Sequence, residues 1–159
     1  CSRIGDWEAD TVIGRQGGAV LVTLVERKSR FSLIIRAENK TATAVSAAMT
    51  TAMSPHAAHV HTLTYDNGKE FAYHLKVSDE LEAKGFFAHP YHSWERGLNE
   101  NTNGLIRQYL PKGKSFDDLT DQDVVDIMDR LNNRPRKCLG FRTPYEVFRK
   151  DKSDVALAS

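Results

Sequence analysis

Three apolar segments near the start of the chain are separated by only two short polar breaks. Residues 7–13 alternate in the manner of a β-strand, and "GRQGG" supplies a turn before the apolar run of residues 19–25. The sequence "ERKSR" forms the second break before "FSLII". Because parallel neighbours need a long crossover connection, these segments are expected to form three antiparallel strands.

The next part of the chain alternates between helical and strand patterns. A helix is predicted over residues 41–53, where apolar side chains recur at helical spacing. Residues 61–66 and 85–88 predict a fourth and a fifth strand. The dipeptide at 67–68, Asn-Gly, is by itself a hairpin signal, but a helical period follows it. We therefore expect this turn to join a strand to a helix.

Helical patterns dominate the last third of the chain. One helix is predicted to begin near Leu98 and to end before Pro111. Thr120 and Asp123 form a capping-box pattern at the start of another, and "TPYE" marks a further helix start at Pro144. The core-facing side of the first of these helices is expected to carry Leu98, Thr102, Leu105 and Tyr109.

The order of these elements predicts an α/β fold. It describes a mixed five-stranded sheet, three antiparallel strands followed by parallel ones, with helices on both faces. A right-handed crossover through the helix at 41–53 would return the fourth strand beside the first. A length of 159 residues suits one domain of this kind, and we see no repeat or linker.

Composition excludes some classes of protein and leaves others open. The chain carries 22 basic and 21 acidic side chains, so total charge favours neither nucleic acid nor an acidic partner. Cys1 and Cys138 have no motif spacing, and the longest apolar run, residues 19–25, is too short to span a bilayer. We expect a soluble cytoplasmic protein with no membrane association.

Two aspartates fall on strands that should be central neighbours in the sheet. Asp10 lies within the first strand and Asp66 at the end of the fourth. Burying a carboxylate on a central strand costs free energy unless donors or cations compensate for it. The structural alternatives are a turn cap for Asp66 and an exposed edge strand for Asp10.

A third acid lies in "WERGLNENTNG", where Glu95 and Glu100 compete. Glu100 shares a helix face with Asn103, Gly104 and Arg107, whereas Glu95 precedes Gly97 in irregular chain. At about 100° per residue, the two glutamates cannot point the same way. Glu100 is therefore the candidate, although favourable placement at a helix N-terminus would also explain it.

Three carboxylates at one end of a sheet predict a two-metal site. Mg²⁺ takes oxygen ligands and is usually held by a few carboxylates together with water and phosphate. Two such ions can activate a nucleophile and stabilise the departing oxygen of a phosphodiester.

Five segments resemble one protein family in order as well as in sequence. They are "WEADTVIG", "TLVERKSRF", "TYDNGKEF", "SWERGLNENTNGLIRQYLPKG" and "RPRKCLGFRTPYEVF". The likeness is to the catalytic core of bacterial transposases of the insertion sequence 30 family, which belong to the retroviral-integrase-like superfamily, and it extends over residues 5–148.

The resemblance implies a ribonuclease H-like fold and an Asp-Asp-Glu triad of Asp10, Asp66 and Glu100 that holds two Mg²⁺ or Mn²⁺ ions. It implies that Arg107 contacts DNA and that the protein acts as a dimer or larger multimer on transposon ends and target DNA. Glu8, on the same strand face as Asp10, is an alternative to it. The N-terminal helix-turn-helix region of such transposases is not found in this chain, which we expect to be a single core domain (1–159).

Basic side chains cluster near the end of the chain. Residues 130–150 carry seven basic side chains against one acidic side chain, Glu146. A solvated surface is the ordinary explanation of such a run, and a nearby phosphate-handling site would favour backbone contacts with DNA. With Arg107, the candidate DNA-binding residues are Lys112, Lys114, Arg134, Arg136, Lys137 and Arg142.

Other side chains suggest weaker hypotheses. Tyr91 and Trp94 could stack on an unpaired base, although packing is the ordinary role of a tryptophan. His56, His59 and His61 have spacing that would suit zinc, but no cysteine lies near them in sequence. His89 and His92 bracket a loop and are either solvated or close to DNA.

The sequence thus predicts a transposase core that cuts DNA at transposon ends and joins the freed 3′ ends to target DNA. Two alternatives stay open at this point. A related metal-dependent nuclease would cut without joining, and a non-catalytic DNA-binding module would need the basic run but not the three acids.

Overall fold

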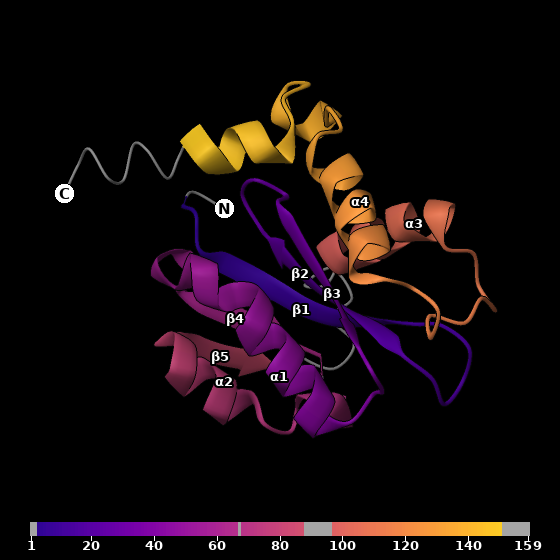
Figure 1. Cartoon of the computed structure of the whole chain (residues 1–159). Coiled ribbons are helices and arrows are strands. Elements are labelled where there is room, and N and C mark those ends of the chain that lie inside the picture. Colours follow the sequence, from indigo (N-terminus) through magenta and orange to yellow (C-terminus); the bar gives the residue numbers. More distant parts are fainter. Residues whose placement is uncertain (1–2, 67, 88–96, 151–159) are drawn as a thin grey trace.

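The computed structural model describes residues 3–66, 68–87 and 97–150. A five-stranded sheet runs through the domain in the order β3-β2-β1-β4-β5 (Figure 1). Its strands are β1 (Asp6–Ile13), β2 (Val20–Glu26), β3 (Ser32–Ala37), β4 (Thr62–Tyr65) and β5 (Lys84–Phe87). The first three strands are antiparallel, and β4 and β5 are parallel to β1. The mixed sheet is confirmed, with β1 and β4 adjacent as predicted.

Helices cover both faces of the sheet (Figure 1). One layer holds α1 (Ala42–Met53) and α2 (His74–Leu81), and the other holds α3 (Gly97–Tyr109) and α4 (Asp121–Asn132). A further helix spans residues 144–150. Short 3₁₀ turns are η1 (Ser54–His59), η2 (Lys69–Phe71) and η4 (Lys137–Leu139). No helix in the described parts is both long and apolar enough to cross a membrane.

Alternation along β1 divides its side chains between two hydrophobic clusters. Trp7 and Ala9 belong to the cluster beneath α1, whereas Val12 belongs to the cluster beneath α3 and α4. Glu8 and Asp10 have the same parity as Val12 and therefore face the layer that holds α3. The alternation along β1 therefore directs the Asp10 side chain, and any reaction in which it takes part, to the face of the sheet that α3 covers.

Polar side chains fix the start of two helices. Thr41 accepts a hydrogen bond from the backbone N–H of Ala44 at the start of α1. Thr120 and Asp123 form a reciprocal capping box at the start of α4, as the sequence predicted. Caps of this kind satisfy backbone N–H groups that have no partner within the helix.

Phe148 attaches the last helix, residues 144–150, to the body of the domain. Its ring stacks on Phe31 with centroids 4.3 Å apart, and Trp7 meets it edge-on at 5.9 Å. Thr143 accepts a hydrogen bond from the N–H of Glu146 and so caps this helix. The helix start predicted at "TPYE" is confirmed.

Candidate active site

Asp10 and Asp66 lie side by side at the point where the parallel pairing between β1 and β4 ends, Asp10 within β1 and Asp66 just after β4. The last recorded pair between β1 and β4 is Ala9 with Tyr65, and the two aspartates follow these residues directly. Asp10 is 7% exposed on a central strand, so the edge-strand alternative for this residue is wrong. The parallel pairing is therefore what brings together two acids that are far apart in sequence.

The buried carboxylate of Asp10 is held by donors from two directions. Its Oδ1 accepts a hydrogen bond of 2.9 Å from the backbone N–H of Thr11. Its Oδ2 accepts one of 3.1 Å from Nδ2 of Asn103, one turn after Glu100 on α3. The hydroxyl of Thr23 lies 3.5 Å from Asn103 Oδ1 and 3.3 Å from the Asp10 carbonyl oxygen. These contacts offset the cost of burying the carboxylate and fix its orientation.

Asp66 begins a tight turn after β4. Its Oδ1 accepts a hydrogen bond of 2.8 Å from the backbone N–H of Gly68, so the turn-cap alternative describes a real interaction of this side chain. A Cβ atom at Gly68 would collide with the carboxylates of Asp66 and Glu70. A larger residue at position 68 would therefore require these two side chains to move. The chain continues into η2 and α2, which confirms a turn from strand to helix.

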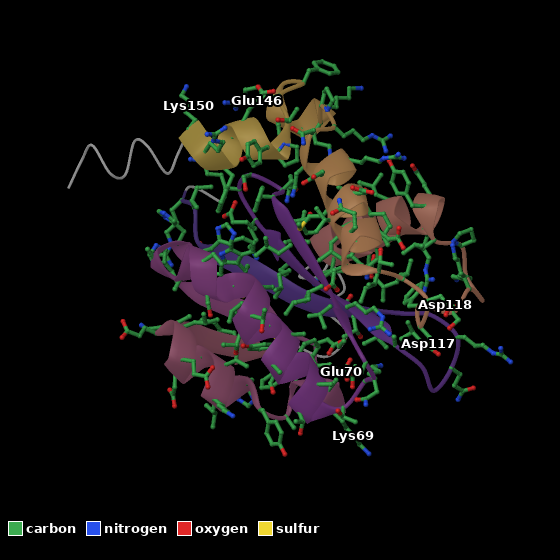
Figure 2. All side chains as sticks on the ribbon, viewed as in Figure 1. Lys69, Glu70, Asp117, Asp118, Glu146 and Lys150 are labelled. Carbon is green, nitrogen blue, oxygen red and sulfur yellow. The ribbon has the colours of Figure 1, made fainter. Side chains whose placement is uncertain are left out.

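Glu70 is a third carboxylate at this end of the sheet, and our sequence reasoning missed it. Its side chain is 5% exposed, and Oε1 lies 3.2 Å from the hydroxyl of Thr11 and 3.4 Å from Nζ of Lys40. Figure 2 shows Glu70 at the lower edge of the domain, beside the outward-pointing Lys69. Glu70 thus contacts the neighbour of Asp10 while it lies beside Asp66. In the sequence, the only indication of Glu70 was an acid four positions after Asp66 in "DNGKEF". The turn η2 directs its side chain into the protein.

Glu100 is exposed in the first turn of α3. The bond between Asn103 and Asp10 docks this helix on the middle of β1, and Glu100 lies one turn before that contact. No group of three acidic, histidine or cysteine side chains in the described segments is close enough together to hold a metal ion. The donor types of Asp10, Asp66 and Glu100 nevertheless suit Mg²⁺, since all are carboxylate oxygens.

The buried face of α3 agrees only in part with the predicted one. Of the predicted stripe, Thr102 is buried, Leu105 and Tyr109 pack against the apolar cluster while partly exposed, and Leu98 is partly buried. The buried side chains of α3 are Asn99, Thr102 and Ile106. The first half of this helix covers polar groups of β1 and β2, and its second half covers the apolar cluster. Apolar spacing cannot reveal a buried face that is polar.

Arg107 has partners inside the protein. Its NH2 donates a hydrogen bond of 2.6 Å to the carbonyl oxygen of Ile13, and its NH1 lies 3.5 Å from that of Leu110. The guanidinium carbon lies 6.0 Å from the centre of the Phe116 ring. Arg107 therefore ties the C-terminal half of α3 to the end of β1. A guanidinium has five N–H donors, so these bonds leave others for a phosphate.

The structure separates the other candidate DNA-binding residues into two groups. Arg136 is 9% exposed and donates a hydrogen bond of 3.2 Å to the carbonyl oxygen of Leu131. Burial lowers the pKa of Arg136 from its ordinary value. Arg136 therefore supports the loop after α4, and little of its side chain is exposed. The exposed candidates are Lys112, Lys114, Arg134, Lys137 and Arg142.

The remaining sequence hypotheses are decided only in part. The rings of His56 and His59 pack around Phe148, and they belong to no three-residue metal cluster in the described chain. Glu8 is buried and forms an ion pair with Arg27, in which Oε2 of Glu8 lies 3.4 Å from Nε of Arg27. The candidates in the segment 88–96, which are His89, Tyr91, His92, Trp94 and Glu95, lie outside the described residues.

The mixed five-stranded sheet with helices on both faces has a ribonuclease H-like fold, as in retroviral integrase cores. The catalytic core domain of BIV integrase superposes on this chain with a TM-score of 0.70, at 18% identity, covering 94% of this chain and 97% of that core. The HTLV-2 integrase core solved with magnesium gives a TM-score of 0.69, also at 18% identity, covering 92% of this chain and 97% of that core. The predicted fold class is confirmed.

The sequence is more closely similar to bacterial transposases. The transposase for insertion sequence element IS4351 of Bacteroides fragilis is 46% identical over 159 residues, which are 99% of this chain and 49% of that protein. Transposase InsI of IS30A from Escherichia coli (strain K12) is 40% identical over 148 residues, which are 92% of this chain and 38% of that protein. Nearly the whole chain is thus homologous to a segment of insertion sequence 30 family transposases.

These matches cover most of this chain but only part of each relative. The chain spans about half the length, or less, of the curated relatives named above. No family model matches the chain. The homology therefore concerns the domain described here and not the complete relatives.

Proposed function

We propose that the chain is the catalytic core of a DNA transposase that cuts DNA at transposon ends and joins the freed 3′ ends to target DNA. The observation that carries this proposal is the convergence of Asp10 and Asp66 on paired parallel strands, with α3 docked on Asp10 by Asn103. Glu100 lies in the first turn of α3, one turn before Asn103, which supports its assignment to the same site.

Asp10, Asp66 and Glu100 are the residues that would hold divalent metal ions, Mg²⁺ or Mn²⁺, with two ions expected. When bound, such ions supply an activated nucleophile and stabilise the departing oxygen of a phosphodiester. Asn103 and Thr11 keep the Asp10 carboxylate oriented, and the Asp66 turn is fixed by the N–H of Gly68. The protein's own part in the chemistry is therefore to hold three carboxylates and a DNA strand in one geometry.

The reaction consists of two phosphoryl transfers. In the first, water attacks the phosphorus atom at a transposon end, the bond to the 3′ oxygen breaks, and this oxygen leaves as a 3′-hydroxyl. In the second, this hydroxyl attacks a target phosphodiester and releases a new 3′-hydroxyl. Each step exchanges one P–O bond for another, so it needs neither a redox partner nor a covalent protein intermediate.

Exposed basic side chains would hold the DNA by its phosphates without reading its sequence. We assign this role to Lys112, Lys114, Arg134, Lys137 and Arg142, with Arg107 added through its remaining donors. We also propose that a dimer or larger multimer acts on paired DNA ends. The related HTLV-2 core has been solved in dimeric and trimeric forms, which supports multimerisation of this fold.

The test is cleavage and joining on labelled duplexes that carry candidate terminal repeats, both uncut and with a 3′ end already exposed, in Mg²⁺ or Mn²⁺. Asp66→Asn and Glu100→Gln are expected to abolish both reactions. Asp121→Asn is the matched control, because Asp121 is also an exposed acid in the first turn of a helix. Cleavage without joining would favour the nuclease alternative. Metal-independent DNA binding without either reaction would favour the binding module.

A further inference from the structure

Phe141 combines an exposed side chain with a backbone conformation that bulky residues rarely adopt. Its side chain is 71% exposed, and its φ angle is +66°. A single exposed apolar residue is ordinary on a protein surface, but a bulky side chain at positive φ is a genuine outlier. Such strain persists where the surrounding structure imposes it, and it concentrates at functional sites.

The loop that carries Phe141 is held by its own backbone. The N–H of Phe141 donates a hydrogen bond of 2.8 Å to the carbonyl oxygen of Arg136, and the N–H of Arg136 donates one of 2.9 Å to that of Arg142. Gly140, at φ +63°, supplies the preceding left-handed residue. Leu139 is buried and anchors the loop to the domain. The phenyl ring is therefore presented to solvent by a closed loop and not by a loose one.

The buried guanidinium of Arg136 strengthens this support from beneath. It donates a hydrogen bond to the carbonyl oxygen of Leu131, in the last turn of α4. This bond connects the loop to a helix whose apolar side lies in the core. A rigid base of this kind lowers the entropic cost of binding, because the exposed ring is already in position.

The surroundings of Phe141 are basic. Arg142 follows it directly, Lys137 and Arg134 lie before it in the same connection, and all three are exposed. Glu146, the acidic residue of this region, lies on the helix that follows the loop (Figure 2). Its carboxylate accepts a hydrogen bond from the hydroxyl of Thr143. An exposed aromatic ring among cations suits nucleic acid, since phosphates pair with the cations and a base offers a flat face for stacking.

We propose that the loop of residues 136–142 presents Phe141 to DNA as an aromatic wedge. Its ring stacks on a base exposed at an open or kinked step, while Lys137 and Arg142 contact the adjacent phosphates. The inference rests on the proposed function in one respect, namely that DNA is the substrate. It adds a contact that is separate from the three carboxylates.

The test measures binding of fluorescent duplexes in EDTA, where no metal-dependent cleavage occurs. One duplex is fully paired, and a second carries 2-aminopurine at an unpaired position. Phe141→Ala is expected to weaken binding of the second duplex about tenfold. The native chain and Phe141→Trp should quench the 2-aminopurine fluorescence, and Phe141→Ala should not. Leu75→Ala is the matched control, because Leu75 is 68% exposed on α2 and should bind DNA normally when replaced.

Phe141→Gly separates function from folding. Glycine accepts positive φ without strain, so this variant should unfold at a temperature equal to or above that of Phe141→Ala while it binds DNA equally poorly. If Phe141→Ala bound the unpaired duplex as tightly as the native chain does, the wedge proposal would be contradicted and the proposed function would be unaffected. A loss of self-association in sedimentation without DNA, with unchanged DNA affinity per protomer, would overturn it in favour of a contact between copies. Failure of the native chain to bind either duplex would contradict both proposals.

Discussion

Nδ2 of Asn103 donates a hydrogen bond of 3.1 Å to Oδ2 of Asp10 and so connects the first turns of α3 to the centre of the sheet. The two residues are separated by 93 positions in the sequence. The contact orients the buried carboxylate of β1 and at the same time positions the helix that carries Glu100. Asn103 is therefore a positioning residue of the proposed active site.

Replacement of Asn103 by alanine should slow the reaction more than it destabilises the fold. Loss of an amide that orients a metal-binding carboxylate is expected to lower the cleavage rate about 10- to 100-fold. The lost hydrogen bond should lower the free energy of unfolding by about 1 kcal/mol. Rates at saturating DNA and chemical denaturation measure the two effects. Asn101→Ala, at an exposed position of the same helix, is the control. Equal rates in the two variants would exclude the positioning role.

Removal of the charge of Glu70 should raise the metal requirement of the reaction. Glu70→Gln keeps a hydrogen-bonding side chain for Thr11 but removes a negative charge beside Asp66, so the site attracts a divalent cation less strongly. The Mn²⁺ concentration that gives half of the maximal cleavage rate should increase. Glu80→Gln, an exposed change on α2, should leave it unaltered. An identical Mn²⁺ dependence in all three proteins would show that Glu70 has a purely structural role.

Arg107→Ala should destabilise the domain in addition to any effect on DNA. Loss of the charged hydrogen bond to the Ile13 carbonyl should lower the free energy of unfolding by about 1.5–3 kcal/mol. If Arg107 contacts a phosphate, its loss should also make the log–log slope of DNA binding against salt concentration shallower by about one unit. Denaturation and salt titrations separate these roles. Native stability together with the reduced slope would mean that the contact with Ile13 contributes little.

Asp6 should stabilise the fold in a pH-dependent manner. Hydrogen bonds from Arg3, and then from Thr62, hold the pKa of the Asp6 carboxyl below its ordinary value. A carboxyl whose pKa is lowered on folding contributes stability above its unfolded pKa, and this contribution is lost as the pH falls through the folded pKa. Asp6→Asn should therefore reduce the melting temperature at pH 7, and the difference should shrink below about pH 4.

Melting curves of the native chain, Asp6→Asn and the exposed control Asp118→Asn across this range measure the effect. A difference between the native chain and Asp6→Asn that stays constant with pH would show that the effect of the substitution is not electrostatic. Because Asp6 on β1 also binds Thr62 on β4, the measurement reports on the strand pairing that brings Asp10 and Asp66 together.

The sequence determined the fold class because its local signals agree with one another. Alternation along residues 7–13, the short breaks that follow and the helical spacing of residues 41–53 each specify one element. The order of these elements then leaves few topologies, and right-handed crossover places β4 beside β1. Asp10 and Asp66 stand out in the amino-acid sequence itself, because an acid on a central strand or at its end needs compensation. Glu100 was selected by its helix face and by the family resemblance.

Tertiary structure decided which polar side chains support these acids. Asn103 and Glu70 gave no periodic signal, because their importance lies in contacts with β1 that cross the fold. The polar part of the buried face of α3, at Asn99, was missed for the same reason, since hydrophobic spacing detects apolar contacts and not hydrogen bonds. The burial of Arg136 and the positive φ angle of Phe141 were likewise visible only in the structure. Local sequence specifies elements, whereas the partners of a charge or a ring depend on the packing of distant segments.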